Sequence, residues 1–335
     1  MNLKTITRII KNHFGFPRTI NWGYSLLICS VGTLLVFFLR NFLAKIESFP
    51  SVTSLVGYSV IISALVVLAL LLPACSLFID RKRSSADLMV DSIGKFSGVG
   101  PLMLSFISGV ALMLIRVPLH NLTVWLWLRI GRTPIFPAFF YVNDSVSKIE
   151  KWTGFLTGVV IPAAGISIFF TGLMWACFSK SEKRIASIVI AVSFALFSLD
   201  FFDFIPLIII AFWLCFLRDA AGNVFAPFLA LVSSGLTSMF FGRFVKEVDV
   251  TMIQVYSDID ATVFYSSLPA FLVGIILLLF FSKSLGEFRE AYYIDFTVND
   301  EDDDRKYFSK GINIALICAL IIFMVLWVQV LKGDR

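Results

Sequence analysis

The stretch GFLTGVVIPAAGISIFFTGLMWACF, residues 154–178, decides the class of fold because it contains no charged side chain. It is longer than the ~20 predominantly apolar residues with which an α-helix crosses the hydrocarbon core of a bilayer. The buried strands and helices of soluble domains are shorter or are interrupted by polar residues. The stretch therefore predicts a transmembrane helix.

Similar apolar runs occupy most of the remaining chain. Of the 335 residues, 58% are hydrophobic and only 15% are charged, and the mean hydropathy is +0.89. Soluble domains contain roughly 25% charged residues. We therefore predict an all-α fold, a polytopic transmembrane helical bundle of about eight to nine spans with an interfacial helix at its N-terminus. The predicted spans are residues 23–43, 53–79, 97–115, 154–178, 185–199, 204–217, 224–242, 262–282 and 311–331.

The chain divides into four regions, which are residues 1–20, 21–153, 154–245 and 246–335. The first is basic, with apolar side chains at helical spacing, and is expected to lie along the membrane surface. The second ends in a segment, residues 116–153, whose tryptophans and arginines favour a helix at the interface. The last contains an acidic run, residues 299–304, which we interpret as a solvated loop.

The distribution of basic residues predicts the orientation. If the N-terminus is inside, more than half of the 28 lysines and arginines fall in cytoplasmic segments. Cytoplasmic loops carry an excess of these residues. We therefore expect a multi-pass protein of the bacterial cytoplasmic membrane with its N-terminus inside.

Cysteines and histidines give no sign of a metal site. The five cysteines lie singly in apolar runs, without a C-x-x-C pair. The two histidines, His13 and His120, fall outside the predicted spans on opposite sides of the membrane, and we interpret each as an interfacial polar residue. We expect no metal and no cofactor. The small net charge of +5 does not favour nucleic acid, so the expected partner is the lipid bilayer.

Three short sequences follow one another within residues 162–235: PAAGISIFFTGL from Pro162, SFALFS from Ser193, and GNVFAPFLAL from Gly222. Their order, and the placing of proline, glycine and phenylalanine, resembles the core of the CPBP (CAAX protease and bacteriocin-processing) intramembrane protease family. The resemblance implies adjacent helices which, in that family, hold a metal through glutamate and histidine side chains.

The positions that would bind the metal carry other residues in this chain. The family's glutamate pair, arginine, two histidines and asparagine correspond, in this order, to Ile166, Ser167, Thr171, Ser198, Leu231 and Gly235. Zinc catalysis needs about three protein ligands and an open position. The resemblance therefore implies a vestigial site in a pseudoenzyme. We expect the helices around it to pack together, with Ser167, Ser198 and Ser234 close to one apolar pocket.

Three functions remain open. The leading hypothesis is a catalytically inactive CPBP-like membrane protein that binds a partner membrane protein or a lipid-like ligand. The alternative is a small-molecule permease or permease subunit, because Asp200, Asp203 and Pro206 indicate a break between two short spans. The third is an unusual hydrolase with Ser198 or Ser233 as nucleophile, although no histidine or lysine in these helices would activate it.

Overall fold

The computed structural model is helical throughout the part of the chain that it describes. The described residues are 22–44, 93–94, 98–130, 152, 155–178, 182–242, 244–245, 247–248, 262–294, 312 and 314–332. Two short π-helical stretches, η1 (Leu156–Val160) and η2 (Ser167–Met174), flank one α-helix. The described α-helices are α2 (Trp22–Ala44), α5 (Val99–Arg129), α7 (Ile161–Ile166), α8 (Lys183–Ser198), α9 (Phe204–Ala221), α10 (Phe225–Phe241), α11 (Thr262–Ile294) and α13 (Ile314–Lys332).

Four of the described helices are long and apolar enough to cross a membrane. They are α5, α9, residues 264–288 of α11, and α13. This confirms the predicted all-α class and supports a membrane protein. The predicted interfacial helix in residues 1–20, the span at 53–79 and the acidic run at 299–304 lie outside the described residues.

Helix α5 is longer than the sequence predicts. The predicted span ends at residue 115, but the helix continues to Arg129, so the first part of the segment 116–153 extends the span. Arg116, Pro118 and His120 resemble a helix end in sequence. The helix continues because Arg116 and His120 find polar partners on other elements, as described below.

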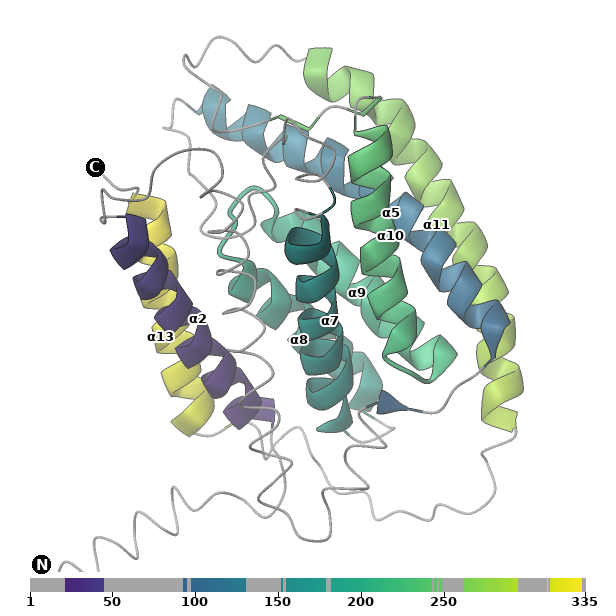
Figure 1. The fold of residues 1–335 in the computed structure, drawn as a ribbon, viewed down its shortest axis with the longest axis horizontal. Helices are drawn as coiled ribbons and strands as arrows, with labels where there is room; N and C mark the ends of the chain where they lie inside the picture. Colours follow the sequence, from purple (N-terminus) through teal and green to yellow (C-terminus); the bar gives the residue numbers. More distant parts are fainter. Residues whose placement is uncertain are drawn as a thin grey trace, which may run out of the picture.

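Glycines bring α5 close to its neighbours. Helix α5 packs against α10 and α11, and also contacts α9 (Figure 1). A Cβ atom at Gly109 of α5 would collide with the Ala230 carbonyl of α10, and one at Gly274 of α11 would lie 2.8 Å from Ile115. Small residues at crossings let membrane helices approach closely and gain van der Waals contact.

The first and last described helices, α2 and α13, lie side by side although they are far apart in sequence (Figure 1). Trp327 joins this pair to the rest of the protein. Its indole nitrogen donates to the Leu196 carbonyl of α8 at 3.0 Å, and its ring meets Phe204 edge to face. Helix α2 also contacts α8. Helices α2 and α13 therefore close one side of the bundle.

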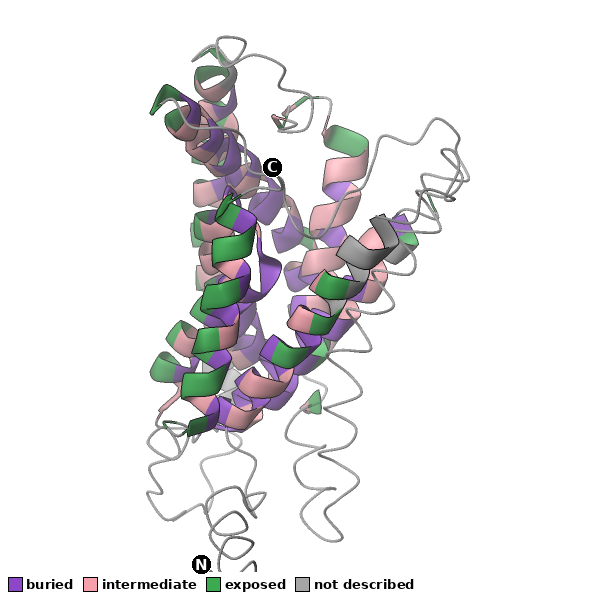
Figure 2. Ribbon diagram, turned by 90° about the vertical axis from the view of Figure 1, so that its left-hand side faces the viewer, coloured by how far each residue is buried: buried purple, intermediate pink, exposed green. Residues whose placement is uncertain are grey.

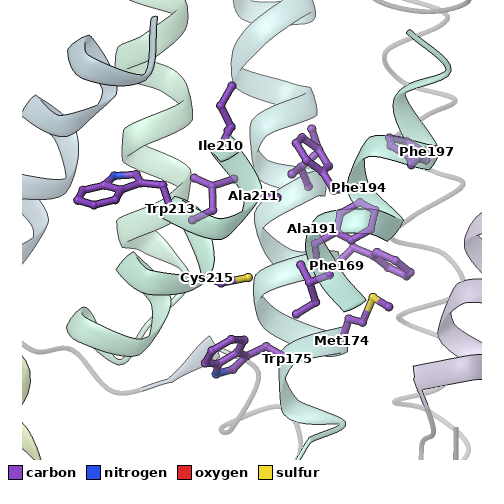
Figure 3. Close-up of a cluster of buried hydrophobic side chains, with 14 of the residues drawn as sticks. Phe169, Met174, Trp175, Ala191, Phe194, Phe197, Ile210, Ala211, Trp213 and Cys215 are labelled. Atoms are coloured by element: carbon purple, nitrogen blue, oxygen red, sulfur yellow. The ribbon is translucent and has the colours of Figure 1, made fainter. Parts of the chain in front are cut away.

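The apolar core lies between η2, α8 and α9. Phe170 contacts the rings of Phe169, Phe194 and Phe197, which come from η2 itself and from α8. Figure 3 shows Phe169, Phe194 and Phe197 in one cluster with Ile210, Ala211 and Cys215 of α9. Phe169 and Phe170 are at most 1% exposed, so this aromatic cluster is fully packed.

The outer helices expose apolar side chains. On α11 these are Leu272, Val273, Ile276, Leu279 and Phe280, and on α13 they are Ile317, Leu320, Ile321, Met324 and Val325. Figure 2 shows such exposed positions interspersed with buried ones along the helices. Exposed apolar patches of this extent are rare on soluble monomers and indicate contact with lipid or a partner.

Candidate functional site

A network of charged side chains connects three separate parts of the chain. Arg116 and His120 lie one turn apart on α5 and therefore share a face of that helix. They meet Asp203, the residue before α9, and Glu247, in the segment between α10 and α11. Ionisable side chains within a membrane helix are rare and usually functional, which makes this network the candidate site.

Asp203 is the buried centre of the network. Its Oδ2 accepts hydrogen bonds from Nε of Arg116 at 2.8 Å and from Nη2, and its Oδ1 lies 3.0 Å from Nδ1 of His120. Burial by itself would raise the pKa of Asp203. The charges of Arg116 and His120, with their hydrogen bonds, outweigh that effect and hold the pKa below its usual range.

Glu247 forms the outer part of the network. Its Oε1 and Oε2 accept from Nη2 and Nη1 of Arg116 at 2.9 and 3.3 Å, which is the bidentate arrangement of an arginine–carboxylate pair. The next residue is also bound to α5. The Val248 amide donates to Oδ1 of Asn121 at 2.9 Å, and the Val248 carbonyl lies 3.2 Å from Nε2 of His120.

Both ring nitrogens of His120 face oxygen acceptors, namely a carboxylate oxygen of Asp203 and the carbonyl of Val248. Two such hydrogen bonds require a proton on each nitrogen, because an imidazole nitrogen donates only when it is protonated. The hydrogen-bond pattern therefore fits an imidazolium. Two cations, Arg116 and His120, then face the two carboxylates that are hydrogen-bonded to them, Asp203 and Glu247.

The network runs from the interior towards the surface. The side chains of His120 and Asp203 are 7% and 6% exposed, whereas those of Arg116 and Glu247 are 29% and 32% exposed. A ligand that approaches from outside would therefore reach the Arg116–Glu247 pair first.

The turn between α8 and α9 positions Asp203. Helix α8 ends at Ser198, and Leu199 follows with φ of +49°. Oδ1 of Asp200 accepts from the amides of Phe202 and Asp203 at 3.1 and 3.2 Å, which shapes the turn. Burial, followed by the negative charge of Asp203, raises the pKa of Asp200 to about 6.

Ligand atoms of His120, Asp203 and Glu247 lie within 4.8 Å of one another, a spacing that a metal ion could bridge. The surrounding charges do not fit a metal. Nη2 of Arg116 already binds both carboxylates. An added divalent cation would have to displace the guanidinium and would leave excess positive charge beside it.

The six vestigial positions are distributed over the helices expected from the sequence. Ile166 ends α7, Ser167 and Thr171 belong to η2, Ser198 ends α8, and Leu231 and Gly235 lie in α10. Contacts link η2 with α8, α9 and α10, and also link α8 with α9 and α9 with α10. The predicted packing of these helices is therefore confirmed.

The side chains at these positions bond locally. Thr171 donates to the Ser167 carbonyl at 2.7 Å, and Ser198 donates to the Ala195 carbonyl at 2.8 Å. The Ser167 hydroxyl is buried without a partner. Among the described residues, no other side-chain hydrogen bond joins two of the six positions.

Close packing accounts for two further features near these positions. A Cβ atom at Gly235 would collide with the Val159 side chain of η1, so a side chain there would push α10 away. Ser234, which we expected near Ser167 and Ser198, lies with its amide against Gly109 of α5.

A buried arginine also contacts one of the six positions. Arg218, on α9, donates from Nε to the Thr171 carbonyl at 2.9 Å.

No protein-family model matches this chain, and no curated protein or solved structure matches it significantly. Membership of the CPBP family stays a prediction from residues 162–235.

The network was only partly anticipated from the sequence. Asp200 and Asp203 were predicted to mark a break, and they do lie in the turn between α8 and α9. His120 was interpreted as interfacial, but it lies within α5 and is buried. Arg116 and Glu247 were missed. The available signal was the spacing of Arg116 and His120, four residues apart and therefore on one face of an apolar helix.

Proposed function

We propose that the protein is a small-molecule permease or permease subunit of the bacterial cytoplasmic membrane, with its N-terminus inside. The observation that supports this most is the hydrogen-bonded network of charged side chains formed by Arg116, His120, Asp203 and Glu247. Two of its members lie near the middle of α5, a helix long and apolar enough to cross the membrane. Ionisable residues in such helices commonly belong to substrate or ion pathways.

The break between α8 and α9 also supports transport. Transporters place substrate sites at interrupted helices, where charged groups and helix ends are available for binding. Here the interruption supplies Asp203, whose backbone carbonyl accepts from the Leu207 amide in the first turn of α9 at 2.8 Å. The carboxylate is thereby attached to a helix end and faces α5.

Uptake by the purified full chain in proteoliposomes tests this function. Radiolabelled organic acids, amino acids and sugars would be offered separately, with an internal pH dye to report proton movement. We expect uptake of at least one solute, and its loss in Asp203→Asn and Asp200→Asn. Glu287→Gln, which changes an exposed carboxylate of α11 outside the network, is the matched control.

Melting temperatures would be recorded for each variant, so that loss of uptake is compared only among folded proteins. Asp200→Asn keeps the Oδ1 acceptor of the turn and serves as the milder variant. Unchanged uptake in both folded variants would contradict a role for the network in transport.

A second function follows from the CPBP resemblance, and a specific observation favours it. Ile166, Ser167 and Thr171 are buried against neighbouring helices, at positions where the family would carry charged side chains. An apolar core in this place suits a catalytically inactive protein that binds a membrane partner or a lipid-like ligand. Stoichiometric zinc, or cleavage of a prenylated peptide that stops after one substitution within residues 162–235, would disprove this function.

A further inference from the structure

The guanidinium of Arg116 presents two edges with different surroundings. The inner edge, Nε and Nη2, donates to one oxygen of Asp203. The outer edge, Nη1 and Nη2, donates to the two oxygens of Glu247. A planar guanidinium fixed along one edge offers a preoriented pair of donors along the other.

The two carboxylates are held very differently. Asp203 is buried, borders α9 and bonds to His120 as well as Arg116. Glu247 lies between α10 and α11, outside both helices, and its side chain is 32% exposed. Asp203 therefore orients Arg116, whereas Glu247 occupies a position that another carboxylate can take.

We propose that the outer edge of Arg116 is a binding site for the carboxylate of an organic acid, and that Glu247 fills this site in the absence of ligand. Organic acids would then be the substrates of the proposed permease, and the biological role of this site rests on that proposed function. Binding itself can be measured without transport.

Charge balance favours a carboxylate over other ligands. When a monocarboxylate replaces Glu247 on Arg116, the two cations still face two negative charges, and Glu247 is released towards the surface. A phosphate dianion would add a negative charge beside Asp203. A cation would meet Arg116 and the imidazolium of His120, which repel it.

Val248, the residue after Glu247, keeps its contacts with α5 during this exchange. The Val248 amide and carbonyl are bound by Asn121 and His120 of α5. Only the Glu247 side chain has to move, so the exchange needs a side-chain rotation and leaves the backbone contacts of Val248 in place.

Binding measurements on the full chain in lipid nanodiscs test the proposal. The probes are butyrate, dodecanoate and inorganic phosphate, with calorimetry as the readout. We expect Glu247→Gln to bind a carboxylate probe roughly ten-fold or more tightly than the unaltered protein, because the internal competitor is lost. Arg116→Lys should bind it roughly ten-fold more weakly, since an ammonium cannot form the bidentate pair. Glu287→Gln should behave as the unaltered protein.

The probes separate two sources of carboxylate. Preference for butyrate indicates a soluble acid, whereas preference for dodecanoate indicates a fatty acid that enters from the membrane. Equal affinity of Glu247→Gln and the unaltered protein, or tighter binding of phosphate than of either acid, would overturn the proposal. A lower melting temperature of Glu247→Gln without tighter binding would also overturn it, because Glu247 would then serve only to stabilise the fold.

The same experiments distinguish this inference from the proposed function. Carboxylate binding without uptake of any solute would refute the permease and leave the binding site in place. Uptake of a neutral solute that depends on Asp203, with no effect of Glu247→Gln on carboxylate binding, would refute the binding site and leave the permease in place.

Discussion

At the scale of single residues, the two aspartates of the turn between α8 and α9 respond to pH in opposite directions. The pKa of Asp203 is lowered in the folded protein, so its contribution to stability is present above its ordinary pKa of 3.8 and is lost in more acidic solution. The pKa of Asp200 is raised from 3.8 to about 6, so the folded protein binds this proton more tightly than the unfolded chain does. Its ionisation therefore destabilises the fold as pH rises between these values.

The Asp200→Asn variant isolates the second effect. We expect it to be more stable than the unaltered protein at pH 7.5, by at most roughly 3 kcal/mol for a shift of about two pKa units, and equally stable near pH 4. Asparagine keeps the oxygen that accepts from Phe202 and Asp203. Thermal unfolding of both proteins across this pH range checks the prediction. A stability difference that does not vary with pH would contradict it.

Charges introduced at the vestigial positions test whether these residues are packed away from water. Ile166 is 7% exposed and Ser167 is 1% exposed. The double variant Ile166→Glu/Ser167→Glu should be less stable by about 2–3 kcal/mol for each uncompensated charge. The glutamine pair at the same positions controls for volume. Equal melting temperatures of the glutamate and glutamine pairs would show that these positions face water.

At the scale of elements, the crossing of α5 and α10 depends on a glycine. A Cβ atom at Gly109 would collide with the backbone carbonyl of Ala230, which cannot turn aside as a flexible side chain can. We expect Gly109→Ala to destabilise the protein by about 1–3 kcal/mol through overpacking. Thermal unfolding of the variant in detergent measures the effect.

Gly286 on α11 provides the matched control, because a Cβ atom there meets nothing within 4 Å. Alanine favours a helix interior over glycine by roughly 0.8–1 kcal/mol, so Gly286→Ala should be neutral or stabilising. If both variants had the same stability, the close approach at Gly109 would not exist in the folded protein.

The helix breaks are also properties of elements. Gly222, with φ of +69°, ends α9, and Oδ1 of Asn223 accepts from the amides of Phe225 and Ala226 at the start of α10. These local signals explain why the predicted boundaries near residues 217 and 224 lie within a few residues of the observed ones. No comparable local signal ends α5 near residue 115, where the predicted span ended, and the helix continues to Arg129.

At the scale of the whole molecule, the exposed apolar surface of α11 should face lipid. Ile276 is 65% exposed, and leucines and phenylalanines surround it along the helix. Ile276→Arg should cost about 2.5–3.5 kcal/mol if this surface lies in the bilayer. The same change on a water-exposed surface should alter stability by about 0.5 kcal/mol or less.

Membrane insertion and thermal unfolding of Ile276→Arg distinguish these two outcomes, with Ile276→Leu as the control for loss of the native side chain. Normal insertion and an unchanged melting temperature of the arginine variant would show that α11 is exposed to water, and would contradict the assignment of residues 264–288 as a membrane span.

The sequence by itself determined that the described chain is helical and rich in apolar surface. Long uncharged runs cannot satisfy their backbone groups in lipid except as helices or closed barrels, and these runs have the length of helices. Composition and local stop signals were sufficient for this, because each acts within a few neighbouring residues. The expectation that η2, α8, α9 and α10 pack together came from the resemblance within residues 162–235, and the contacts among these elements agree with it.

Only the tertiary structure decided which polar residues meet. The predicted span ended at residue 115, because the tryptophans and arginines of residues 116–153 favoured a helix at the interface. Asp203 and Glu247, 87 and 131 residues away from Arg116, form hydrogen bonds with its guanidinium, and the helix continues through this position. Hydrogen bonds between distant segments depend on how the helices pack. The spacing of polar residues within one segment does not determine which other segment packs against it.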